Sequence, residues 1–358
     1  MHLDNLRLIN FRIYDKFETD FSDGLNIITG DNGIGKSSIL EAVHYLSLTK
    51  SFRSNKDEES VKFDSDHFLT SGVFISDDGI EEKISISYSK KAGKIIKSQG
   101  KKVTTSGDIV GKHPIVFLSP EDVINTLGSP SGHRKFLNMS ISQVKNRHLN
   151  NLLFYRSVLK QRNSAIGYAA SGSESFEKTL DVVEIQIGEL CEAIVKDRKK
   201  FIGEISAEFE KIFSELNNGK KSGSIKYHPS IEGNKEEMIS SFKDRRAADF
   251  NAGYTTKGPH RDRLSFKIND KSLKSFGSKG ENKVFLVALK IAQGNYIHRN
   301  KGIRPIYILD DIFMELDRKH AVEIVERIKN SGQVIITTTD FGEWSDMVGS
   351  NVNVIGLT

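Results

Sequence analysis

The sequence predicts an α/β protein whose head, a mixed sheet plus an antiparallel meander, is interrupted by an inserted α-helical antiparallel arm. Three patterns lead to this prediction. Short, nearly all-apolar segments such as 25–29 and 304–309 are typical of strands buried on both faces. Between about residues 68 and 118, apolar and polar residues alternate with the period of two that a half-buried strand requires. From about residue 140 to residue 216, apolar residues recur every three or four positions, as in helices.

The N-terminal part of the head is expected to span residues 1–122. The predicted elements are strands near 6–12, 17–21, 25–29 and 114–118 and a helix that ends near Leu48. Turns at 77–79 and 91–93 divide the alternating stretch between them, which indicates an antiparallel meander. Ser119-Pro120 follows the last of these strands and is typical of a helix start.

The arm is expected to occupy residues 123–240. Apolar residues at helical spacing form a seam that includes Leu180, Val183, Ile187, Leu190, Ile194, Ile205 and Leu216. A seam of about 40 residues corresponds to roughly 60 Å of helix. Two helices joined by the polar loop near 171–173 would form an antiparallel pair. The head is expected to resume over 241–358, with a helix after Gly280 and a last buried-type strand at 333–339.

The composition excludes several classes of protein. The 358 residues carry 52 Lys and Arg against 47 Asp and Glu, a net charge of +5 that permits binding to a polyanion without demanding it. One cysteine, Cys191, excludes a disulfide framework and a cysteine-based zinc site. Charged residues interrupt the N-terminus, and no apolar run approaches the roughly 18 residues of a membrane span. We therefore expect a cytoplasmic protein without a membrane partner.

A phosphate-binding loop connects the strand 25–29 to the first helix. The pattern GxxxxGK[ST] is matched by Gly30, Asp31, Asn32, Gly33, Ile34, Gly35, Lys36 and Ser37, and Ser38 follows it. Glycines let successive backbone N–H groups surround a phosphate, and the helix N-terminus adds its dipole. Lys36 would reach the β and γ phosphates of ATP, and the Ser37 hydroxyl would be a ligand of Mg²⁺.

The segment 306–311 predicts the other half of the same site. It is an apolar strand that delivers two carboxylates, Asp310 and Asp311, at its carboxyl end. Asp310 would hold Mg²⁺ through water, and Asp311 would orient or deprotonate the attacking water as the catalytic residue. Two acids that merely cap the next helix are the alternative.

Two further segments resemble the ABC-type ATPase heads of the chromosome-maintenance and Rad-fifty proteins. Ser278-Lys279-Gly280-Glu281 stands shortly before the Asp-Asp strand, and Glu315-Leu316-Asp317 follows it. The resemblance implies that Ser278 and Gly280 touch the γ-phosphate bound to a second subunit, so that ATP holds a homodimer together. It also implies that Asp317 belongs to the D-loop, that Thr339 takes the switch position and that Arg12 reaches the nucleotide. The pattern S-x-x-E is equally a capping box.

The chain resembles the RecF family of bacterial recombination mediators more specifically. The motifs that carry this resemblance are Asn10-Phe11-Arg12, Ser51-Phe52-Arg53, Phe117–Asp122, Gln161-Arg162-Asn163 and Gly258-Pro259-His260-Arg261-Asp262. The resemblance implies a slow, DNA-stimulated ATPase that binds single-stranded and gapped DNA, dimerises on ATP and acts with RecO and RecR. Replication restart and SOS induction would depend on it. A Gln that transport-type heads place after Leu118 is absent, and Ser119, Glu121 or Asp122 could stand in for it.

Lysines concentrate in the predicted meander and are candidates for DNA contact. They are Lys90, Lys91, Lys94, Lys97, Lys101 and Lys102, and the runs at 196–200 and 243–246 are further candidates. Such runs are also common on solvated faces that bind nothing. Two other functions remain open: an ABC-type ATPase subunit of another DNA-maintenance or transport complex, and a nuclease of the overcoming-lysogenisation type, which would need an acidic metal-binding domain after the head.

Overall fold

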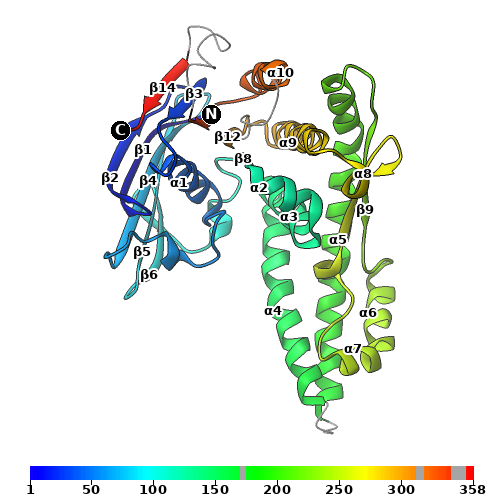
Figure 1. Ribbon diagram of the computed structural model, residues 1–358. Helices are drawn as coiled ribbons and strands as arrows, with labels where there is room; N and C mark the ends of the chain where they lie inside the picture. Colours follow the sequence, from blue (N-terminus) through cyan, green and yellow to red (C-terminus); the bar gives the residue numbers. More distant parts are fainter. Residues whose placement is uncertain (170–174, 312–317, 340–351) are drawn as a thin grey trace. The chain divides into compact units, whose positions relative to one another are not determined.

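The computed structural model describes residues 1–169, 175–311, 318–339 and 352–358 (Figure 1). The chain forms two compact units. Unit 1 contains Met1–Val123, Glu215–Asn218 and Ser278–Thr358, and unit 2 contains Ile124–Ser214 and Gly219–Gly277. The second boundary differs from the sequence interpretation, which assigned residues 241–277 to the head. These residues group with the arm because a strand at 263–268 pairs with one at 223–228.

A five-stranded parallel sheet forms the centre of unit 1. Its strands are β3 (Leu25–Thr29), β8 (Ile115–Leu118), β12 (Ile306–Asp310), β13 (Val334–Thr338) and β14 (Val352–Gly356), in the order β14-β3-β13-β12-β8. All pairs are parallel, so the carboxyl ends of the strands share one edge, which is where ligands bind in sheets of this kind. The apolar runs are almost wholly buried, as the sequence predicts for a parallel sheet covered on both faces.

The predicted meander is a six-stranded antiparallel sheet. It contains β1 (His2–Phe11), β2 (Tyr14–Asp20), β4 (His67–Ile75), β5 (Glu81–Ser89), β6 (Gly93–Ser98) and β7 (Lys101–Val103), in the order β2-β1-β4-β5-β6-β7. Helix α1 (Lys36–Leu48) packs on strands of both sheets and is buried along almost its whole length. Because α1 is enclosed, its polar side chains must find partners inside the protein.

The remaining elements of unit 1 flank the parallel sheet. They are η1 (Asp57–Ser60), η2 (Ser106–Asp108), α2 (Pro120–Asp122), α9 (Lys279–Lys301) and α10 (Arg318–Lys329). Helix α9 packs against β8. The predicted helix starts at Pro120 and after Gly280 are therefore both present.

Unit 2 is the helical arm with a small sheet. Its elements are η3 (Val123–Leu127), α3 (Pro130–Val144), α4 (Asn146–Ala169), α5 (Ser175–Leu216), β9 (Gly223–His228), α6 (Lys235–Asp244), α7 (Arg246–Ala252), η4 (Pro259–Arg261), β10 (Arg263–Ile268), β11 (Lys271–Ser272) and α8 (Leu273–Phe276). The first residue of η3 and the last two of α5 group with unit 1. Helices α4 and α5 lie side by side and form the arm (Figure 1). The apolar seam of α5 is buried, and Leu180 packs with Ala165 and Ile166 of α4. The predicted fold class, a P-loop ATPase head with an inserted helical arm, is confirmed.

None of the helices in the described part of the chain is long and apolar enough to span a membrane.

Candidate functional site

The phosphate-binding loop lies between β3 and α1, as predicted. Gly35 is the N-cap residue of α1, and its φ of 104° lies in the region that favours glycine. A Cβ at Gly35 would also lie 2.5 Å from Ile13 Cδ1 and 2.8 Å from Tyr14 Oη. At the other end of the loop, a Cβ at Gly30 would lie 2.9 Å from the Leu357 carbonyl oxygen. Both glycines are therefore required by the close packing around the loop as well as by its backbone conformation.

The side chains of Lys36 and Ser37 have different partners. Lys36 is only 4% exposed, and its ammonium donates to the carbonyl oxygens of Gly30 at 2.7 Å and Asp31 at 2.9 Å. The lysine therefore lies along the loop that would surround a phosphate. Ser37 hydrogen-bonds to the Asp310 carboxylate. Asp31, Asn32 and Gly33 are exposed, Ile34 is half-buried, and Ser38 is buried inside α1.

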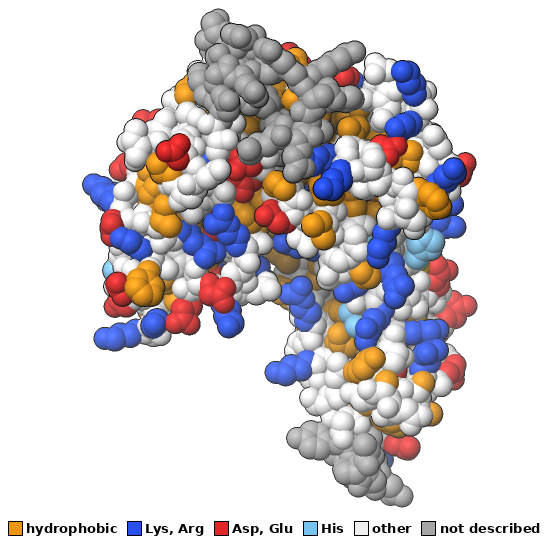
Figure 2. Space-filling model, viewed as in Figure 1, with side chains coloured by type: hydrophobic (Ala, Val, Ile, Leu, Met, Phe, Trp, Pro, Cys, Tyr) orange, Lys and Arg blue, Asp and Glu red, His pale blue; other side chains and the backbone are white. Residues whose placement is uncertain are grey.

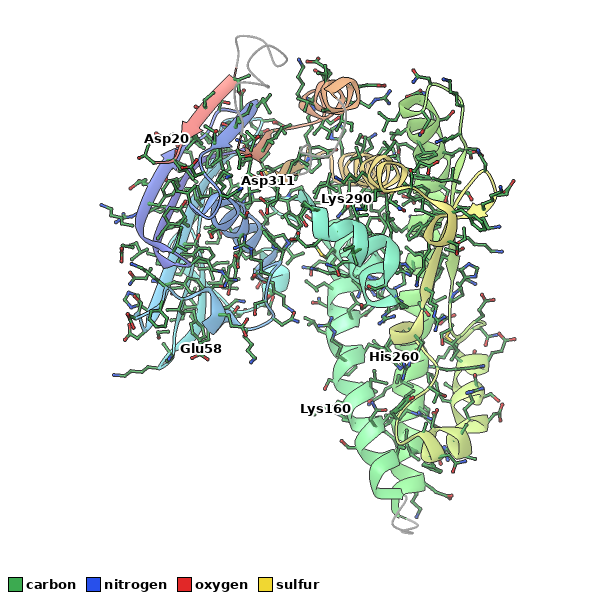
Figure 3. All side chains as sticks on the ribbon, in the orientation of Figure 1. Asp20, Glu58, Lys160, His260, Lys290 and Asp311 are labelled. Carbon is green, nitrogen blue, oxygen red and sulfur yellow. The ribbon has the colours of Figure 1, made fainter. Side chains whose placement is uncertain are left out.

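The two predicted carboxylates lie at the carboxyl end of β12. Asp310 is buried, and its Oδ1 accepts a hydrogen bond from the Thr337 hydroxyl at 2.8 Å. The backbone N–H of Asp311 donates to the same Thr337 Oγ1 at 3.0 Å. Asp311 has a φ of 44°, an uncommon conformation for a residue with a side chain and one that is concentrated at functional sites. Figure 3 shows Asp311 just beyond the end of β12.

One oxygen of Asp311 lacks a partner. Among the described residues, nothing hydrogen-bonds to Oδ1 of Asp311, although this atom is buried. A buried polar atom without a partner costs about 1–3 kcal/mol and calls for an explanation. A bound water or ligand at this edge of the sheet would supply the missing hydrogen bond.

The electrostatics of the pair agree with a site for cations. Burial raises the pKa of Asp310, whereas hydrogen bonds from Thr337 and Ser37 lower it. Burial also raises the pKa of Asp311, the charge of Asp310 raises it further, and Lys36 lowers it. Two neighbouring buried carboxylates are an arrangement that a divalent cation stabilises. Oxygen donors such as Ser37 and Asp310 are the ligands that Mg²⁺ prefers, so the residues present fit this ion.

Of the two acids that follow β8, Glu121 affects the electrostatics of Asp310. Because Leu118 pairs with Leu309, residues 119–121 follow the same edge of the sheet as Asp310. The charge of Glu121 raises the pKa of Asp310. Asp122 is instead paired with Lys290 at 3.3 Å. Transport-type heads place a Gln after this strand, and Ser119, Glu121 and Asp122 are the candidates to replace it. Of these three, Glu121 is electrostatically coupled to Asp310.

Arg12 is held by a buried carboxylate that the sequence analysis did not identify. Its Nε lies 2.9 Å from Oε2 of Glu41, and its terminal nitrogen lies 2.5 Å from Oε1. Glu41 stands in α1 and is fully buried. It also accepts from the Ser51 hydroxyl at 2.6 Å and lies 3.6 Å from Arg53. The motifs at 10–12 and 51–53 therefore meet on one side chain of the helix that follows the phosphate loop.

The start of α9 is exposed and capped. Ser278, Lys279 and Gly280 are exposed, and nothing lies within 4 Å of a Cβ built at Gly280. The Ser278 hydroxyl accepts from the Glu281 N–H at 3.2 Å, and the Glu281 carboxylate accepts from the Ser278 N–H at 2.7 Å. The capping box is present, and the acid at 281 turns back onto the helix end.

Thr339 and Asp317 are the two remaining positions that the sequence predicts for the nucleotide site. Thr339 follows β13 directly and is half-buried, so it stands at the same sheet edge as Thr337. Asp317 lies outside the described residues. Thr337 itself was not identified from the sequence, because a threonine in a buried strand of β-branched residues carries no local signal.

The lysines of the meander fall into two groups. Lys94 donates to the Thr49 carbonyl and lies 3.1 Å from Asp57, and Lys90 lies 3.3 Å from Glu58. These two side chains are therefore partly neutralised within unit 1. The exposed remainder comprises Lys91, Lys97, Lys101 and Lys102. Lys97 and Lys102 are direct neighbours across β6 and β7, an arrangement of like charges that is unfavourable without an anion.

The motif Gln161-Arg162-Asn163 belongs to the interior of unit 2. Arg162 is fully buried, and all three of its guanidinium nitrogens are hydrogen-bonded. Its carboxylate partners are Glu184 at 2.9 Å and Asp249 at 2.6 Å. Asn163 accepts from both the N–H and the hydroxyl of Thr255. This motif therefore fixes the loop that precedes the motif at 258–262.

The motif at 258–262 is also held from within unit 2 (Figure 3). His260 lies 2.5 Å from Tyr155 Oη and 3.0 Å from the Thr255 carbonyl oxygen. The carbonyl can only accept, so Nε2 carries the proton and Nδ1 accepts from Tyr155. Asp262 is fully buried and paired with Arg198 at 2.5 Å. Only Arg261 of this motif is exposed.

Comparison with known proteins agrees with this arrangement. The family model of the RecF/RecN/SMC N-terminal domain matches residues 2–355. A DNA replication and repair protein RecF of Chlorobium luteolum is 34% identical over 349 residues, which cover 95% of this chain and 94% of that protein. A RecF of Chloroherpeton thalassium is also 34% identical, over 97% of each chain.

Solved structures agree as well. A structure of the recombination mediator protein RecF-ATPrS in the RecFOR pathway has a TM-score of 0.90 and 28% identity, and it covers 99% of this chain and 96% of that one. The corresponding RecF-ATP structure has a TM-score of 0.88 and 29% identity over 95% and 92%. An Smc head from Pyrococcus furiosus, at a TM-score of 0.56 and 17% identity over 99% and 93%, shares the fold. The chain is thus a member of the RecF family of DNA replication and repair proteins and is built on an ABC/SMC-type ATPase head.

Proposed function

We propose that this protein is an ATP-dependent DNA-binding protein of recombinational repair. The observation that carries this proposal is the meeting of Lys36, Ser37, Asp310 and Asp311 at one edge of the parallel sheet. The solved relatives named RecF-ATP and RecF-ATPrS support ATP as the nucleotide. The RecFOR pathway in which these two relatives are placed supports action together with RecO and RecR. We further infer that this action takes place at single-stranded gaps, in replication restart and in SOS induction.

Each residue of the site has a specific part in this proposal. The N–H groups of Gly30–Ser37 and the ammonium of Lys36 bind the phosphates of ATP, which replace the loop carbonyls as partners of the lysine. Ser37 would be a direct ligand of Mg²⁺ and Asp310 would hold the ion through water, and the ion would neutralise charge on the phosphates. Asp311 orients the attacking water through the carboxylate oxygen that has no partner among the described residues. Arg12, held by Glu41, contacts the nucleotide.

ATP hydrolysis is proposed to control dimerisation. The exposed helix start at 278–280 has three features that suit a phosphate from outside: free space at Gly280, a serine hydroxyl and a helix N-terminus. We infer that it completes the site of a second copy of the chain, with Asp317 and Thr339 at the same contact. Hydrolysis is slow because each site needs both copies before the water is in position.

The DNA contact is proposed for the exposed lysines of the meander, Lys91, Lys97, Lys101 and Lys102. The juxtaposition of Lys97 and Lys102 supports this, because an external phosphate would relieve their repulsion. Lys90 and Lys94 contribute less, since acids of unit 1 already neutralise them.

Mixing two inactive variants tests the composite site. Lys36→Ala and Ser278→Arg each damage both sites of their own homodimer, whereas a mixed dimer has one site with both lesions and one intact site. Equal mixing should therefore restore roughly a quarter of wild-type hydrolysis, because about half of the dimers are mixed. Neither variant alone should hydrolyse ATP, and Lys279→Gln, next to the second lesion, is the control that should stay active.

The outcomes separate the parts of the proposal. If Lys36→Ala hydrolyses ATP normally while folded, the nucleotide site is wrongly assigned. If mixed dimers form but recover no activity, the composite site is refuted for independently acting sites. If light scattering shows a monomer at every MgATP concentration, dimerisation is refuted while ATP binding stands.

A further inference from the structure

The small sheet of unit 2 has one apolar and one basic face. On β9 and β10, the side chains of Ile225, Tyr227, Leu264, Phe266 and Ile268 are buried. The alternating positions face solvent and carry Ser224, Lys226, His228, Arg263, Ser265 and Lys267. We call this set the basic sheet face. It contains hydroxyl groups, an imidazole and cations, and no acidic residue.

The register brings these groups together. Arg263 pairs with His228, Ser265 with Lys226 and Lys267 with Ser224, so every position has a polar or basic neighbour on the adjacent strand. Arg263 and Lys267 are separated along the strand by roughly 13 Å at 3.3 Å per residue. Neighbouring strands lie about 4.8 Å apart, so Lys226 stands beside the middle of that line. The cations therefore form a row instead of a single point.

Two arginines extend the row beyond the sheet. Arg261 is exposed, and its guanidinium lies over the ring of Tyr254, 4.9 Å from the centroid. Tyr254 is itself 45% exposed. Arg134 of α3 is hydrogen-bonded to the Asp262 carbonyl oxygen at 3.3 Å, beside the end of the sheet. An exposed guanidinium stacked on an exposed aromatic ring is a surface on which nucleic-acid bases stack.

These cations are not neutralised by the protein. In the part of the chain that the structure describes, no ion pair joins Lys226, Arg261, Arg263 or Lys267 to a carboxylate. Asp262, the acid between Arg261 and Arg263 in the sequence, is fully buried and already bound by Arg198 and by the Ser230 N–H. Burial lowers the pKa of Arg134, and the charges of Arg198, Arg261 and Arg263 lower it further, whereas the charge of Asp262 raises it.

Other basic segments of unit 2 differ from the basic sheet face because their charges are paired with acids. Lys199 lies 3.8 Å from Glu232, Lys200 lies 3.5 Å from Glu204, and Arg246 is bound to Glu184. Those segments were candidates from the sequence because their charges are adjacent along the chain. The basic sheet face is not visible as a charge run in the sequence, because its charges alternate with apolar residues on two strands. In Figure 2, blue and pale-blue side chains gather over this region of unit 2.

We propose that the basic sheet face, together with Arg261 and Tyr254, is a binding surface for a single strand of DNA. The row of cations follows the phosphates, the serine hydroxyls donate to phosphate oxygens, and Tyr254 with Arg261 receives a base. This inference rests on the proposed DNA-binding function and adds to it a surface in unit 2 that is separate from the lysines of the meander.

A salt titration tests the surface. Binding of a fluorescent oligo-dT is measured over a range of salt for the full chain with MgATP and for Arg263→Gln/Lys267→Gln. Loss of two phosphate contacts should make the log–log slope shallower by about 1.4, since each contact on a single strand contributes about 0.7. The matched control, Lys56→Gln/Lys235→Gln, removes two charges that already lie beside acids and should leave the slope unchanged.

The base contact has its own test. Tyr254→Leu should weaken binding about fivefold or more without changing the slope, because stacking is worth about 1–3 kcal/mol per base and involves no counterion. Tyr254→Phe should bind like the wild type.

Each outcome has one reading. Wild-type protein that binds no DNA refutes the DNA-binding function itself. Wild-type binding with an unchanged slope in Arg263→Gln/Lys267→Gln refutes the basic sheet face and leaves the function in place. If this variant instead loses binding to polyaspartate but not to DNA, the surface takes an acidic protein and the inference is wrong. Equal melting temperatures of variant and control exclude misfolding as the cause of a lower slope.

Discussion

The nucleotide site of unit 1 and the motif cluster of unit 2 use buried charge in opposite ways. Around Asp311, a carboxylate oxygen has no partner among the described residues, and the backbone takes an uncommon conformation. Around Arg162, every guanidinium nitrogen has a partner in its own unit. Both regions contain motifs that mark the family. The fully paired cluster around Arg162 holds the arm together, whereas the unpaired oxygen of Asp311 is consistent with the nucleotide-binding role proposed for that site.

The largest effect is expected at Asp311. Asp311→Asn should lower ATP hydrolysis by about 10²–10⁴-fold, the range of a lost acid–base group, while MgATP binding remains. The melting temperature should stay the same or rise, because the change removes a charge that Asp310 repels. Single-turnover hydrolysis and a nucleotide-binding titration measure both quantities.

Asp310→Asn is the matched comparison at the neighbouring carboxylate. It should lose the dependence of ATP binding on Mg²⁺, since this side chain is assigned to the metal. If Asp310→Asn traps bound ATP and Asp311→Asn loses the Mg²⁺ dependence, the two roles are exchanged.

Arg162→Met should have the largest effect on stability. Removal of one partner from a buried ion pair costs about 3–5 kcal/mol, because Glu184 and Asp249 would lose their shared cation. Arg156→Met, at an exposed position of the same helix, should cost less than about 0.5 kcal/mol. Denaturant unfolding measures both. A cost below about 1 kcal/mol for Arg162→Met would contradict the structural reading of this motif.

Glu41→Gln tests a residue that shares features of both regions. Glu41 is paired with arginines, as in the cluster around Arg162, yet it lies in the helix that follows the phosphate loop. The neutral amide cannot balance Arg12 and Arg53, and we expect a loss of about 2 kcal/mol of stability. If Arg12 contacts the nucleotide, KM for ATP should also rise, by about threefold to tenfold at an unchanged kcat. Glu41→Asp should restore part of the affinity. An unchanged KM would make Glu41 a purely structural residue.

The smallest expected effect is the contribution of His260 in unit 2 to the pH dependence of stability. The pKa of His260 is lowered from 6.5 to about 4, chiefly by burial and also by the charges of Arg261 and Arg134, whereas the Thr255 carbonyl and the charge of Asp249 oppose the shift. Because the unfolded chain binds the proton first, the stability that neutral His260 contributes is complete above pH 6.5 and is lost as the pH falls to 4.

His260→Gln keeps both hydrogen bonds but does not titrate. The loss of stability between pH 6.5 and pH 5 should therefore be smaller than in the wild type, by about 1.5 kcal/mol. Unfolding curves at several pH values measure the difference. Equal losses in the two proteins would show that other groups dominate the acid sensitivity.

The elements that carry the proposed nucleotide site could be predicted because their signals are local. Gly30–Ser37 lies within one strand–loop–helix, and Asp310 and Asp311 end one apolar strand, so short-range patterns suffice. Parallel strands then bring their carboxyl ends to one edge, which is a general property of such sheets. The capping box at Ser278 and Glu281 is local in the same sense, and the structure contains it.

The sequence by itself therefore determined the head, the arm and the elements that carry phosphate-binding and acidic residues, because period, glycines and charges act over a few neighbouring positions. Only the tertiary structure decided which side chains meet across long separations. Thr337 reaches Asp310 because β12 and β13 pair, and Glu41 gathers Arg12 and Arg53 because α1 is enclosed between two sheets. The pairing of β9 with β10 likewise assigned residues 241–277 to the arm and created the basic sheet face. A buried polar group needs a hydrogen-bonding partner, and a strand needs a neighbouring strand to pair with. In each of these cases the partner lies far away in the sequence, so the topology of the fold decides which residue it is.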